Sequence, residues 1–402
     1  MRIAFSSQPI YSHLVPVVLP AAAEAAAAGH DVVVLTSQAL ADEVRRAGLR
    51  PLVLANALGP AELAGDPDLA RELGLDMQPL GDFGTRTLHI SPEHFTRIFA
   101  GPLAGRFAAE AIEELREWKP DLVVGECTDY GSYYAAEYLG VPAAVLDIAP
   151  LGPFDAHPAT LEQINTQRGA LGLAAVSDPL HPFRRRRLGV IAESFYPPQA
   201  RTGSTRYFRP PHAPADQQLD PDVAALPGDR PWVLATLGSN AARLLDDDKP
   251  GLLDTLVDVL GELPVTGIVA LGRDTDPDRW RGARPDNVHL TSFAQQQLLL
   301  PLCDAFVTHA GFSGIRESLS SGVPVVAVPM FAEQPANAAR VAELGAGRQL
   351  AVEDATHARL RQAIEAVLDD PVYRYRARDL QRELLSLPEF SALVGDLEEL
   401  VS

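Results

Sequence analysis

The chain has 402 residues, 47% of them hydrophobic, and this length exceeds what one ordinary hydrophobic core supports. We therefore expect two α/β domains, and the hydrophobic content excludes a mainly disordered protein. The formal net charge of −19 argues against nucleic acid or anionic lipid as the principal partner.

The low number of cysteines argues against a disulfide-stabilised protein and against a cysteine-ligated metal site. The two cysteines, Cys127 and Cys303, lie one in each half of the chain. Two residues make neither a disulfide framework nor a metal site, so we expect buried free thiols in a reducing cytoplasm and no bound metal. The chain opens on an apolar strand pattern, without a cationic segment or a long apolar run. We therefore expect a cytoplasmic protein with no signal peptide and no membrane insertion.

Residues 2–36 predict a strand, a loop, an alanine-rich helix and a second parallel strand. The loop carries His13 just before the expected start of the helix. A lone histidine at such a place commonly caps a helix or packs against it. We favour a functional role because the loop follows the carboxyl end of a strand, where ligands of open α/β sheets bind.

Residues 54–103 are less regular, with Pro, Gly and Asp interrupting short helical patches. Long irregular segments on a rigid scaffold commonly carry binding specificity. Phe83, Phe95 and Phe99 are our candidate binding residues here. The alternative, that they form ordinary core beneath a long loop, remains open for each of them.

Residues 107–150 repeat the pattern clearly, as an amphipathic helix, a strand, a loop, a helix and another strand. The loop after the strand carries Glu126 and Asp129. A carboxylate there could reach His13 across the same sheet edge. For Asp129 the alternative is a cap for the following helix.

Residues 151–206 predict helices joined by loops and contain four consecutive arginines, Arg184–Arg187. In so acidic a chain we interpret these arginines as a solvated helix face or a linker, not as a phosphate or nucleic-acid site. Residues 213–229, rich in proline and aspartate, predict the linker between the two domains.

The second half restarts with a strand from residue 232, followed by a turn at Gly238 and Ser239. Asp246–Asp248 comes next and could suggest a metal site, but we interpret it as a charged surface loop. Further strands are expected within residues 265–272 and 287–293.

The most informative stretch is residues 292–337. An apolar run is followed by the glycine-containing turn 309–314 and then by a pattern of helical period. Such a turn places the first amides of the helix, and the positive end of its dipole, at the carboxyl edge of a parallel sheet. The next strand delivers Glu333 and Gln334 beside the same place. The residues alone therefore predict a nucleotide or phosphate site.

The same stretch resembles the donor-binding signature of inverting nucleotide-sugar glycosyltransferases of the GT-B fold, in particular the bacterial natural-product (antibiotic) branch. So many matches within one long motif are far more specific than a lone glycine-rich turn. The matching positions are Phe293 (usually Trp), Gln296, His309, Gly311, Ser313, Glu317, Gly322, Pro324, Pro329, Glu333, Gln334 and Asn337.

The resemblance extends to the first half through His13, followed by Pro16, and through Glu126, where the family usually has Asp. The longer glutamate side chain is a departure that puts the position of the carboxylate in doubt. The likeness is weakest in residues 55–105 and 150–210.

The resemblance implies an α/β fold of two Rossmann-like, doubly wound parallel-sheet domains facing each other across a crevice. Residues 1–212 would bind the acceptor and residues 213–229 would link the domains. Residues 230–380 would bind the nucleotide sugar, and a C-terminal helical segment, 381–402, would cross back to the N-terminal domain.

The implied activity is inverting hexosyl transfer from a dTDP- or UDP-sugar to a hydroxyl of a hydrophobic natural-product aglycone. His13 would be the general base, with Glu126 or Asp129 as its partner. The nucleotide sugar would be a co-substrate, and neither a metal nor another cofactor would be needed. Partners would be the aglycone and the nucleotide sugar, and a homodimer remains open.

The resemblance also implies roles for single residues. Phe293 would stack on the base, Glu317 would bind the ribose, and Glu333 with Gln334 would hold the sugar hydroxyls. Phe83, Phe95 and Phe99 would line the acceptor pocket. The remaining donor-site positions, several of them around the diphosphate, would be Gly238, Ser239, Gln296, His309, Gly311, Phe312, Ser313 and Gly314.

Two other function classes stay open at this point. A sugar-nucleotide epimerase or hydrolase of the same fold would use the donor site without an acceptor pocket. A non-catalytic helper subunit would share the fold alone, but His13 and the intact donor motif argue against it.

Overall fold

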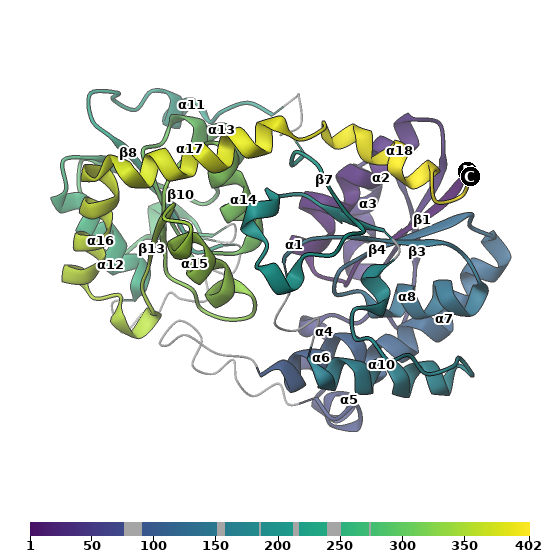
Figure 1. The fold of residues 1–402 in the computed structure, drawn as a ribbon. Coiled ribbons are helices and arrows are strands. Elements are labelled where there is room, and N and C mark those ends of the chain that lie inside the picture. Colours follow the sequence, from purple (N-terminus) through teal and green to yellow (C-terminus); the bar gives the residue numbers. More distant parts are fainter. Residues whose placement is uncertain (76–90, 151–156, 185, 212–216, 239–250, 273–274) are drawn as a thin grey trace. The chain divides into compact units, whose positions relative to one another are not determined.

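The computed structural model describes residues 1–75, 91–150, 157–184, 186–211, 217–238, 251–272 and 275–402. These residues form two compact units (Figure 1). Unit 1 contains the described residues up to Pro211 together with Leu387–Ser402, and unit 2 contains those in between.

Unit 1 is built on a seven-stranded sheet with the order β3-β2-β1-β4-β5-β6-β7, and all its strand pairs are parallel. The strands near its middle are apolar and almost fully buried, as expected for a sheet covered on both faces. The strands are β1 (Arg2–Ser6), β2 (Asp31–Thr36), β3 (Arg50–Val53), β4 (Leu122–Glu126), β5 (Ala143–Leu146), β6 (Arg187–Gly189) and β7 (Thr205–Tyr207).

Helices cover both faces of this sheet, with α7 and α8 on one side and α2 and α3 on the other (Figure 1). Apolar residues of α7 and α8 pack on Ala4, Val33 and Val123 of the strands. The helices of unit 1 are α1 (Tyr11–His13), α2 (Leu19–Ala27), α3 (Ala41–Arg46), α4 (Pro60–Gly65), α5 (Pro67–Glu72), α6 (Pro92–Ala100), α7 (Pro102–Trp118), α8 (Tyr130–Leu139), α10 (Pro158–Ala170) and α18 (Leu393–Glu398).

Unit 2 has a six-stranded parallel sheet with the order β10-β9-β8-β11-β12-β13. Its side chains alternate between two separate cores, since Val307 points to one and Phe306 to the other. The strands are β8 (Trp232–Thr236), β9 (Thr266–Ala270), β10 (Val288–Thr291), β11 (Ala305–Thr308), β12 (Val325–Ala327) and β13 (Gly347–Gln349).

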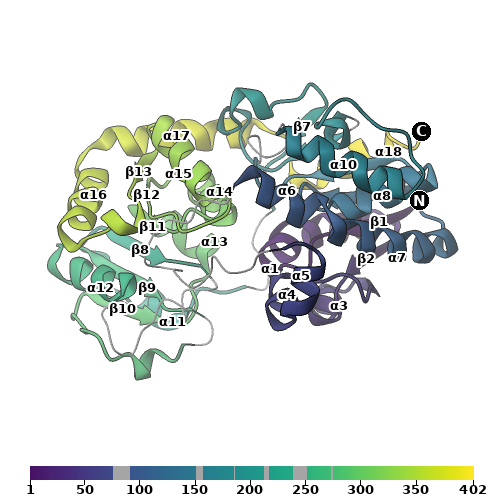
Figure 2. The same cartoon turned by 90° about the horizontal axis from the view of Figure 1, so that it is seen from below.

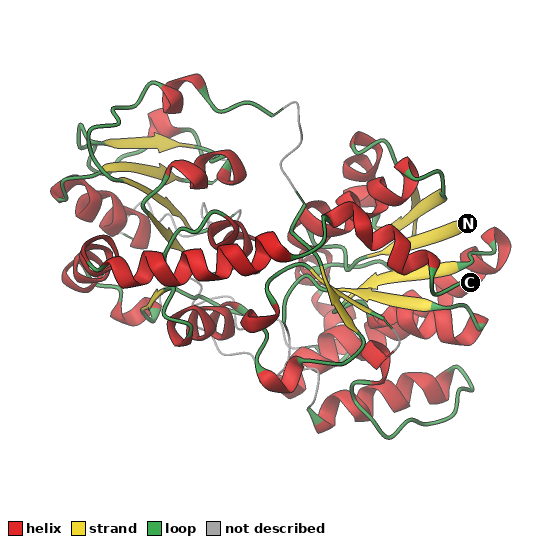
Figure 3. Cartoon of the chain, turned by 45° about the horizontal axis from the view of Figure 1, so that its top comes forward, coloured by secondary structure: helices red, strands yellow, loops and turns green. Residues whose placement is uncertain are grey.

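The helices of unit 2 also flank its sheet (Figure 3). Buried leucines of two of them, Leu256 and Leu360, lie in the same core as Val307. These helices are α11 (Pro221–Ala224), α12 (Leu252–Glu262), α13 (Gln296–Leu299), α14 (Phe312–Ser320), α15 (Gln334–Glu343), α16 (His357–Asp369) and α17 (Pro371–Ser386).

Two parallel, doubly wound sheets confirm the predicted fold class. The two cysteines are buried free thiols, also as predicted. In the part of the chain that the structure describes, no helix combines the length and hydropathy that crossing a membrane requires.

The prediction for residues 151–206 was wrong in two respects. Short strands β6 and β7 extend the sheet in this region, where only helices and loops were expected. The four arginines are not one solvated face either. Arg184 is exposed, but Arg187 is fully buried in β6 and bound to the equally buried Asp147. A charge is tolerated in a core when an opposite charge compensates it, and the local sequence pattern does not show that partner.

The helix after β1 begins earlier than predicted, so that His13 lies in its first turn, α1, and not in the preceding loop. A π-helical turn, Leu14–Val18, follows and joins α1 to α2. Pro16 lies within this wider turn. Because proline has no N–H to donate, it favours such a local departure from the α-helical hydrogen-bond pattern.

Candidate active site

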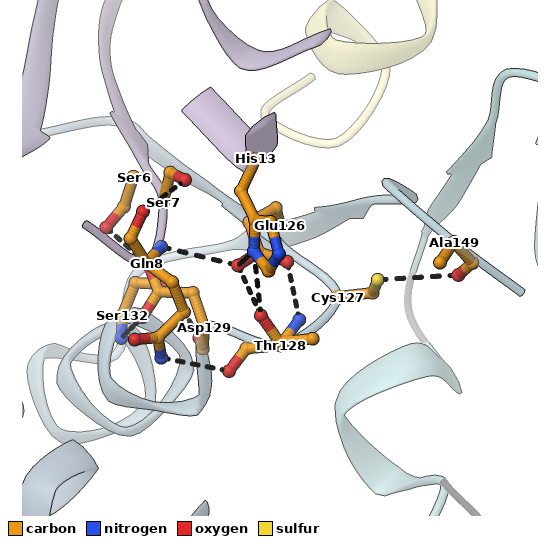
Figure 4. Close-up of polar contacts among 10 residues, drawn as sticks. All are labelled: Ser6, Ser7, Gln8, His13, Glu126, Cys127, Thr128, Asp129, Ser132 and Ala149. Carbon is orange, nitrogen blue, oxygen red and sulfur yellow. Dashed lines mark hydrogen bonds and ion pairs between the residues drawn. The ribbon is translucent and has the colours of Figure 1, made fainter. Parts of the chain in front are cut away.

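The first candidate site lies in unit 1, at the carboxyl ends of β1 and β4. These strands are parallel neighbours in which Ser6 is paired with Gly125. The segments that follow them therefore start side by side at one sheet edge. One leads into α1 with His13, and the other carries Glu126, Thr128 and Asp129 (Figure 4).

His13 and Glu126 are in direct contact. The distance between His13 Nδ1 and Glu126 Oε1 is 3.2 Å, and the Glu126 side chain is fully buried. Glu126 also accepts hydrogen bonds from the Thr128 amide, the Thr128 hydroxyl and the Gln8 amide. The carboxylate is thus held by groups from both loops.

These contacts determine the protonation state of the pair. Burial alone would raise the pKa of Glu126, but the adjacent His13 imidazole and the hydrogen bonds from His13 and Thr128 hold this pKa below its ordinary value. An ionised carboxylate can only accept, so the proton of a neutral His13 sits on Nδ1. The Nε2 lone pair is then available to take a proton, which is the property of a general base.

Asp129 does not contact His13 in this structure. Its side chain caps α8 by accepting from the Ser132 amide at 3.1 Å, and it accepts a second hydrogen bond from the Ser6 hydroxyl. Burial, with a contribution from the charge of Glu126, raises the pKa of Asp129 to about 6, although the Ser6 hydrogen bond opposes the rise. Of the two candidate carboxylates, Glu126 is the one that touches the imidazole.

The second candidate site lies in unit 2, in the loop between β11 and α14. The N-cap residue of this helix is Gly311, which has no side chain that could cap the first turn. Ala310, one residue earlier, has a φ of 63°, a left-handed conformation that is unfavourable for alanine. Asn337 Nδ2 donates to the Ala310 carbonyl at 3.0 Å and supports this backbone.

The imidazole of His309 is cradled by two glycines. A Cβ added at Gly238 would lie 2.7 Å from its ring, and one added at Gly311 would lie 2.5 Å from it. Burial lowers the pKa of His309 to about 4, against an opposing hydrogen bond with the backbone at Thr236. Near neutral pH this imidazole is therefore uncharged, and its single N–H is engaged by the backbone carbonyl of Thr236.

The next loop, between β12 and α15, repeats the strained geometry. Ala332 has a φ of 55°, and Glu333 and Gln334 follow at the start of α15. Gln334 is buried, and its side-chain oxygen accepts from the amides of Met330 and Phe331. Gln334 therefore fixes the loop with its oxygen, a contact that the sequence pattern did not predict.

Glu317 lies on α14, and burial raises its pKa despite the nearby Arg316 and a hydrogen bond from Gln297. The Gln297 Nε2 to Glu317 Oε1 distance is 3.3 Å. Phe293, after β10, is an exposed aromatic residue, with 44% of its surface accessible.

The structure does not unite all the predicted residues. Phe95 is buried on α6, and its ring packs on that of Phe99 at a centroid distance of 4.6 Å, within the helical core of unit 1. Gln296 is the first residue of α13. Gly314 lies on α14 against β11, where an added Cβ would make an ordinary contact with the Phe306 ring at 3.4 Å. Phe83 and Ser239 lie outside the described residues.

Sequence reasoning did not assign a role to Thr128, Gln8 or Gln297, which contact the predicted residues directly. Thr128 and Gln8 could have been noticed because each lies just beyond a strand of the predicted sheet edge. Gln297 carried no such signal, because only the folding of α13 beside α14 brings it to Glu317.

Comparison with known sequences gives two family matches. The profile of the erythromycin biosynthesis protein CIII-like N-terminal domain matches residues 24–151, and that of the C-terminal domain matches residues 252–400. The chain is 30% identical over 385 residues to the L-demethylnoviosyl transferase of Streptomyces niveus, covering 95% of this chain and 94% of that protein. It is 29% identical over 405 residues to the oleandomycin glycosyltransferase of Streptomyces antibioticus, covering 95% and 87%.

Among solved structures, the chain is similar to the glycosyltransferase VinC in complex with dTDP. The TM-score is 0.74 at 22% identity, and the match covers 100% of this chain and 99% of that one. At this level of identity the similarity bears on the fold, and it agrees with the two-sheet architecture described above.

Proposed function

Because the chain belongs to the erythromycin biosynthesis protein CIII-like family of glycosyltransferases, we propose that it transfers a sugar from a nucleoside-diphosphate sugar to a hydroxyl group of a natural-product aglycone. The names of its relatives, among them a transferase of a noviosyl sugar and an oleandomycin glycosyltransferase, support such an acceptor class. The dTDP bound to VinC makes a dTDP-sugar the first donor to test, with a UDP-sugar as the second.

The proposed chemistry is a single displacement with inversion. His13 Nε2 removes the proton of the acceptor hydroxyl while the acceptor oxygen forms a bond to the anomeric carbon. The bond from that carbon to the diphosphate oxygen breaks, and its electron pair leaves with the nucleoside diphosphate. Glu126 orients the imidazole and stabilises the imidazolium that forms. A general base of this kind contributes roughly a hundredfold to ten-thousandfold in rate.

The donor half of the proposal is supported by the start of α14. The first turn of this helix and its dipole attract the diphosphate, and the anion in turn favours a protonated His309, whose second N–H can donate to it. These groups also stabilise the negative charge that develops on the leaving group. The exposed ring of Phe293 is available for stacking on the nucleotide base, and Glu317 for the ribose.

The observation that carries the proposal is the His13–Glu126 contact, with Nδ1 engaged and Nε2 available. We expect His13→Ala to reduce kcat by at least about a hundredfold while the affinity for dTDP stays unchanged, because proton removal matters only in the transition state. Glu126→Gln should reduce kcat less. Turnover is measured with dTDP-glucose and UDP-glucose as donors, and with umbelliferone (a phenol) and oleandomycin (bearing aliphatic hydroxyls) as acceptors.

A matched control is His357→Ala, which breaks another histidine–carboxylate contact, at 3.3 Å from Glu262 on the surface of unit 2. It should leave turnover and nucleotide affinity unchanged. A folded His13→Ala protein with full turnover on an aliphatic hydroxyl would refute the mechanism. A loss of dTDP affinity and thermal stability together would instead indicate a structural histidine.

A further inference from the structure

Thr128 contacts both members of the His13–Glu126 pair. Its hydroxyl donates to Glu126 Oε1 and lies 3.4 Å from His13 Nδ1 (Figure 4). Its own amide donates to the other carboxylate oxygen, Oε2, at 2.6 Å. One residue therefore binds both oxygens of the Glu126 carboxylate and also approaches the imidazole.

The chemistry of these groups determines the direction of each contact. The ionised Glu126 can only accept, so the single hydroxyl proton of Thr128 points to it. A lone pair of the same hydroxyl oxygen then faces the Nδ1–H of His13, as a secondary acceptor beside Glu126 Oε1. In the neutral tautomer with its proton on Nε2, Nδ1 would have no proton to donate to either acceptor. The threonine and the glutamate therefore both favour the Nδ1–H tautomer of His13.

The position of Thr128 is itself fixed by the neighbouring loop. Gln8, which follows β1, donates from its side-chain amide to the Thr128 carbonyl at 3.1 Å and from its backbone to Glu126 Oε1. Thr128 is 2% exposed, so its hydroxyl has little access to solvent. These contacts hold the hydroxyl in place before any substrate binds.

We propose that Thr128 is a positioning residue for the base: its hydroxyl fixes the Glu126 carboxylate so that His13 keeps its proton on Nδ1. The inference rests on the proposed function of His13. It also explains how a glutamate can occupy this place, because its additional side-chain torsion would otherwise leave the carboxylate free to rotate.

The competing explanation is purely structural, since a buried threonine hydroxyl needs a hydrogen-bond partner whatever the chemistry. Two variants separate these explanations. Thr128→Val has nearly the same shape and lacks the hydroxyl, while Thr128→Ser keeps it. A structural role would affect the melting temperature alone, whereas a positioning role changes the imidazole of His13.

The first measurement needs no acceptor. The imidazole nitrogen shifts of isotope-labelled histidine report the tautomer by NMR, and the His13 signals are assigned as those missing from His13→Ala. We expect a single Nδ1–H tautomer in the wild type and in Thr128→Ser, and a tautomer mixture in Thr128→Val. The same tautomer state in all three proteins would overturn the proposal.

The second measurement is a double-mutant cycle on kcat, with dTDP-glucose as donor and oleandomycin as acceptor. Thr128→Val should lower kcat about tenfold, as expected for losing a hydrogen bond to a charged group, and should leave the KM for the donor unchanged. Thr128→Ser should recover most of the loss. In the Glu126→Gln background the valine substitution should have no further effect, because Thr128 acts through the carboxylate.

An equal loss in both backgrounds would show that Thr128 acts independently of Glu126, and it would refute the proposal. The proposed function fails separately. Full turnover in His13→Ala would refute the role of His13 as the base. A large loss of turnover in His13→Ala together with normal turnover in Thr128→Val would refute only the role of Thr128.

Discussion

Different neighbours give two buried carboxyl groups at the end of β4 opposite properties. Glu126 is ionised because the His13 imidazole and several donors outweigh the effect of burial on its pKa. Asp129, three residues later, does not contact His13, and the charge of Glu126 opposes its ionisation. Environment, not residue type, therefore separates the partner of the base from a helix cap.

This difference predicts how Asp129 affects stability. Its pKa rises from 3.8 to about 6 on folding, so its contribution is favourable at low pH and is lost as pH rises through about 6. The Asp129→Asn variant can still cap α8 but has no carboxyl group to ionise. We therefore expect it to keep the stability that the wild type loses as pH rises. Its free energy of unfolding should exceed that of the wild type by up to about 3 kcal/mol at neutral pH, and the gain should shrink towards pH ~4.

The measurement is urea unfolding of both proteins across this pH range. Glu126→Gln serves as the control of opposite sign, since a lowered pKa contributes stability that is lost only as pH falls. Parallel stability curves for the wild type and Asp129→Asn would contradict the prediction.

His309 gives the second prediction at this scale. Because its pKa is lowered to about 4, the imidazole of the unliganded protein is neutral in the working range. A diphosphate beside it would favour the protonated form, whose second N–H can donate to the anion. His309→Ala should weaken dTDP binding by about tenfold to a hundredfold, the value of one hydrogen bond to a charged group. His309→Gln, which keeps a donor, should lose less. Calorimetric titration with dTDP gives the answer, and unchanged affinity in the alanine variant would exclude the role.

At the scale of elements, helix starts differ in whether a side chain caps them. Asp129 caps α8 and Ser91 caps α6 with side-chain oxygens, which satisfies the local amides. Gly311 at the start of α14 offers no side chain, and the backbone before it is held in a strained conformation. A helix start without a side-chain cap is compatible with the anion site that we propose at α14.

The C-terminal segment shows how distant elements complete a unit. Residues Leu387–Ser402 belong to unit 1 and lie beside α2, the helix that continues from His13 (Figure 1). Figure 2 shows the same segment, with α18, from below. Ion pairs between Arg186 and Asp396 and between His30 and Glu398 join the segment to the rest of the unit. The fully buried Leu393 anchors it in the core.

We therefore expect Leu393→Ala to destabilise the protein by about 2–5 kcal/mol through the lost contacts and the cavity left behind. Leu385→Ala is a close control, since this leucine lies eight residues earlier on α17 and is 57% exposed. The control should change stability by no more than about 0.5 kcal/mol. Chemical unfolding of both variants tests the difference, and equal losses would show that the segment is not anchored by Leu393.

For the whole molecule, the important fact is that the candidate base and the candidate diphosphate site belong to different units. His13 and Glu126 lie in unit 1, while His309 and the start of α14 lie in unit 2. Each unit contains its own sheet and its own cores. The proposed reaction therefore assigns acceptor activation to one unit and donor binding to the other.

This assignment predicts a hydrogen-exchange pattern. dTDP alone should slow amide exchange in the β11–α14 loop and the β12–α15 loop of unit 2, because bound nucleotide stabilises the local structure that it contacts. The β4–α8 loop of unit 1 should exchange as in the unliganded protein. Mass spectrometry of peptides from both units gives the comparison, and equal protection around Glu126 would contradict the division.

The sequence alone determined those features that depend on local periodicity. Apolar strand runs, helical spacing and glycine turns indicated two parallel-sheet domains, and the motif in residues 292–337 indicated the start of α14 as an anion site. His13 was correctly expected near the first strand, although its helix begins earlier than predicted. Backbone geometry responds to neighbouring residues, so a local pattern is sufficient for such features.

Only the tertiary structure decided which distant side chains meet. The pairing of β1 with β4 brings His13 to Glu126 across 113 positions, and it leaves Asp129 as a cap. The burial of Arg187 in β6 depends in the same way on Asp147, which directly follows the neighbouring strand β5. The local sequence predicts that a charged residue is solvated, and it does not distinguish one carboxylate near a strand end from another. Their partners and their pKa values follow from strand register and burial, and these exist only once the sheet has formed.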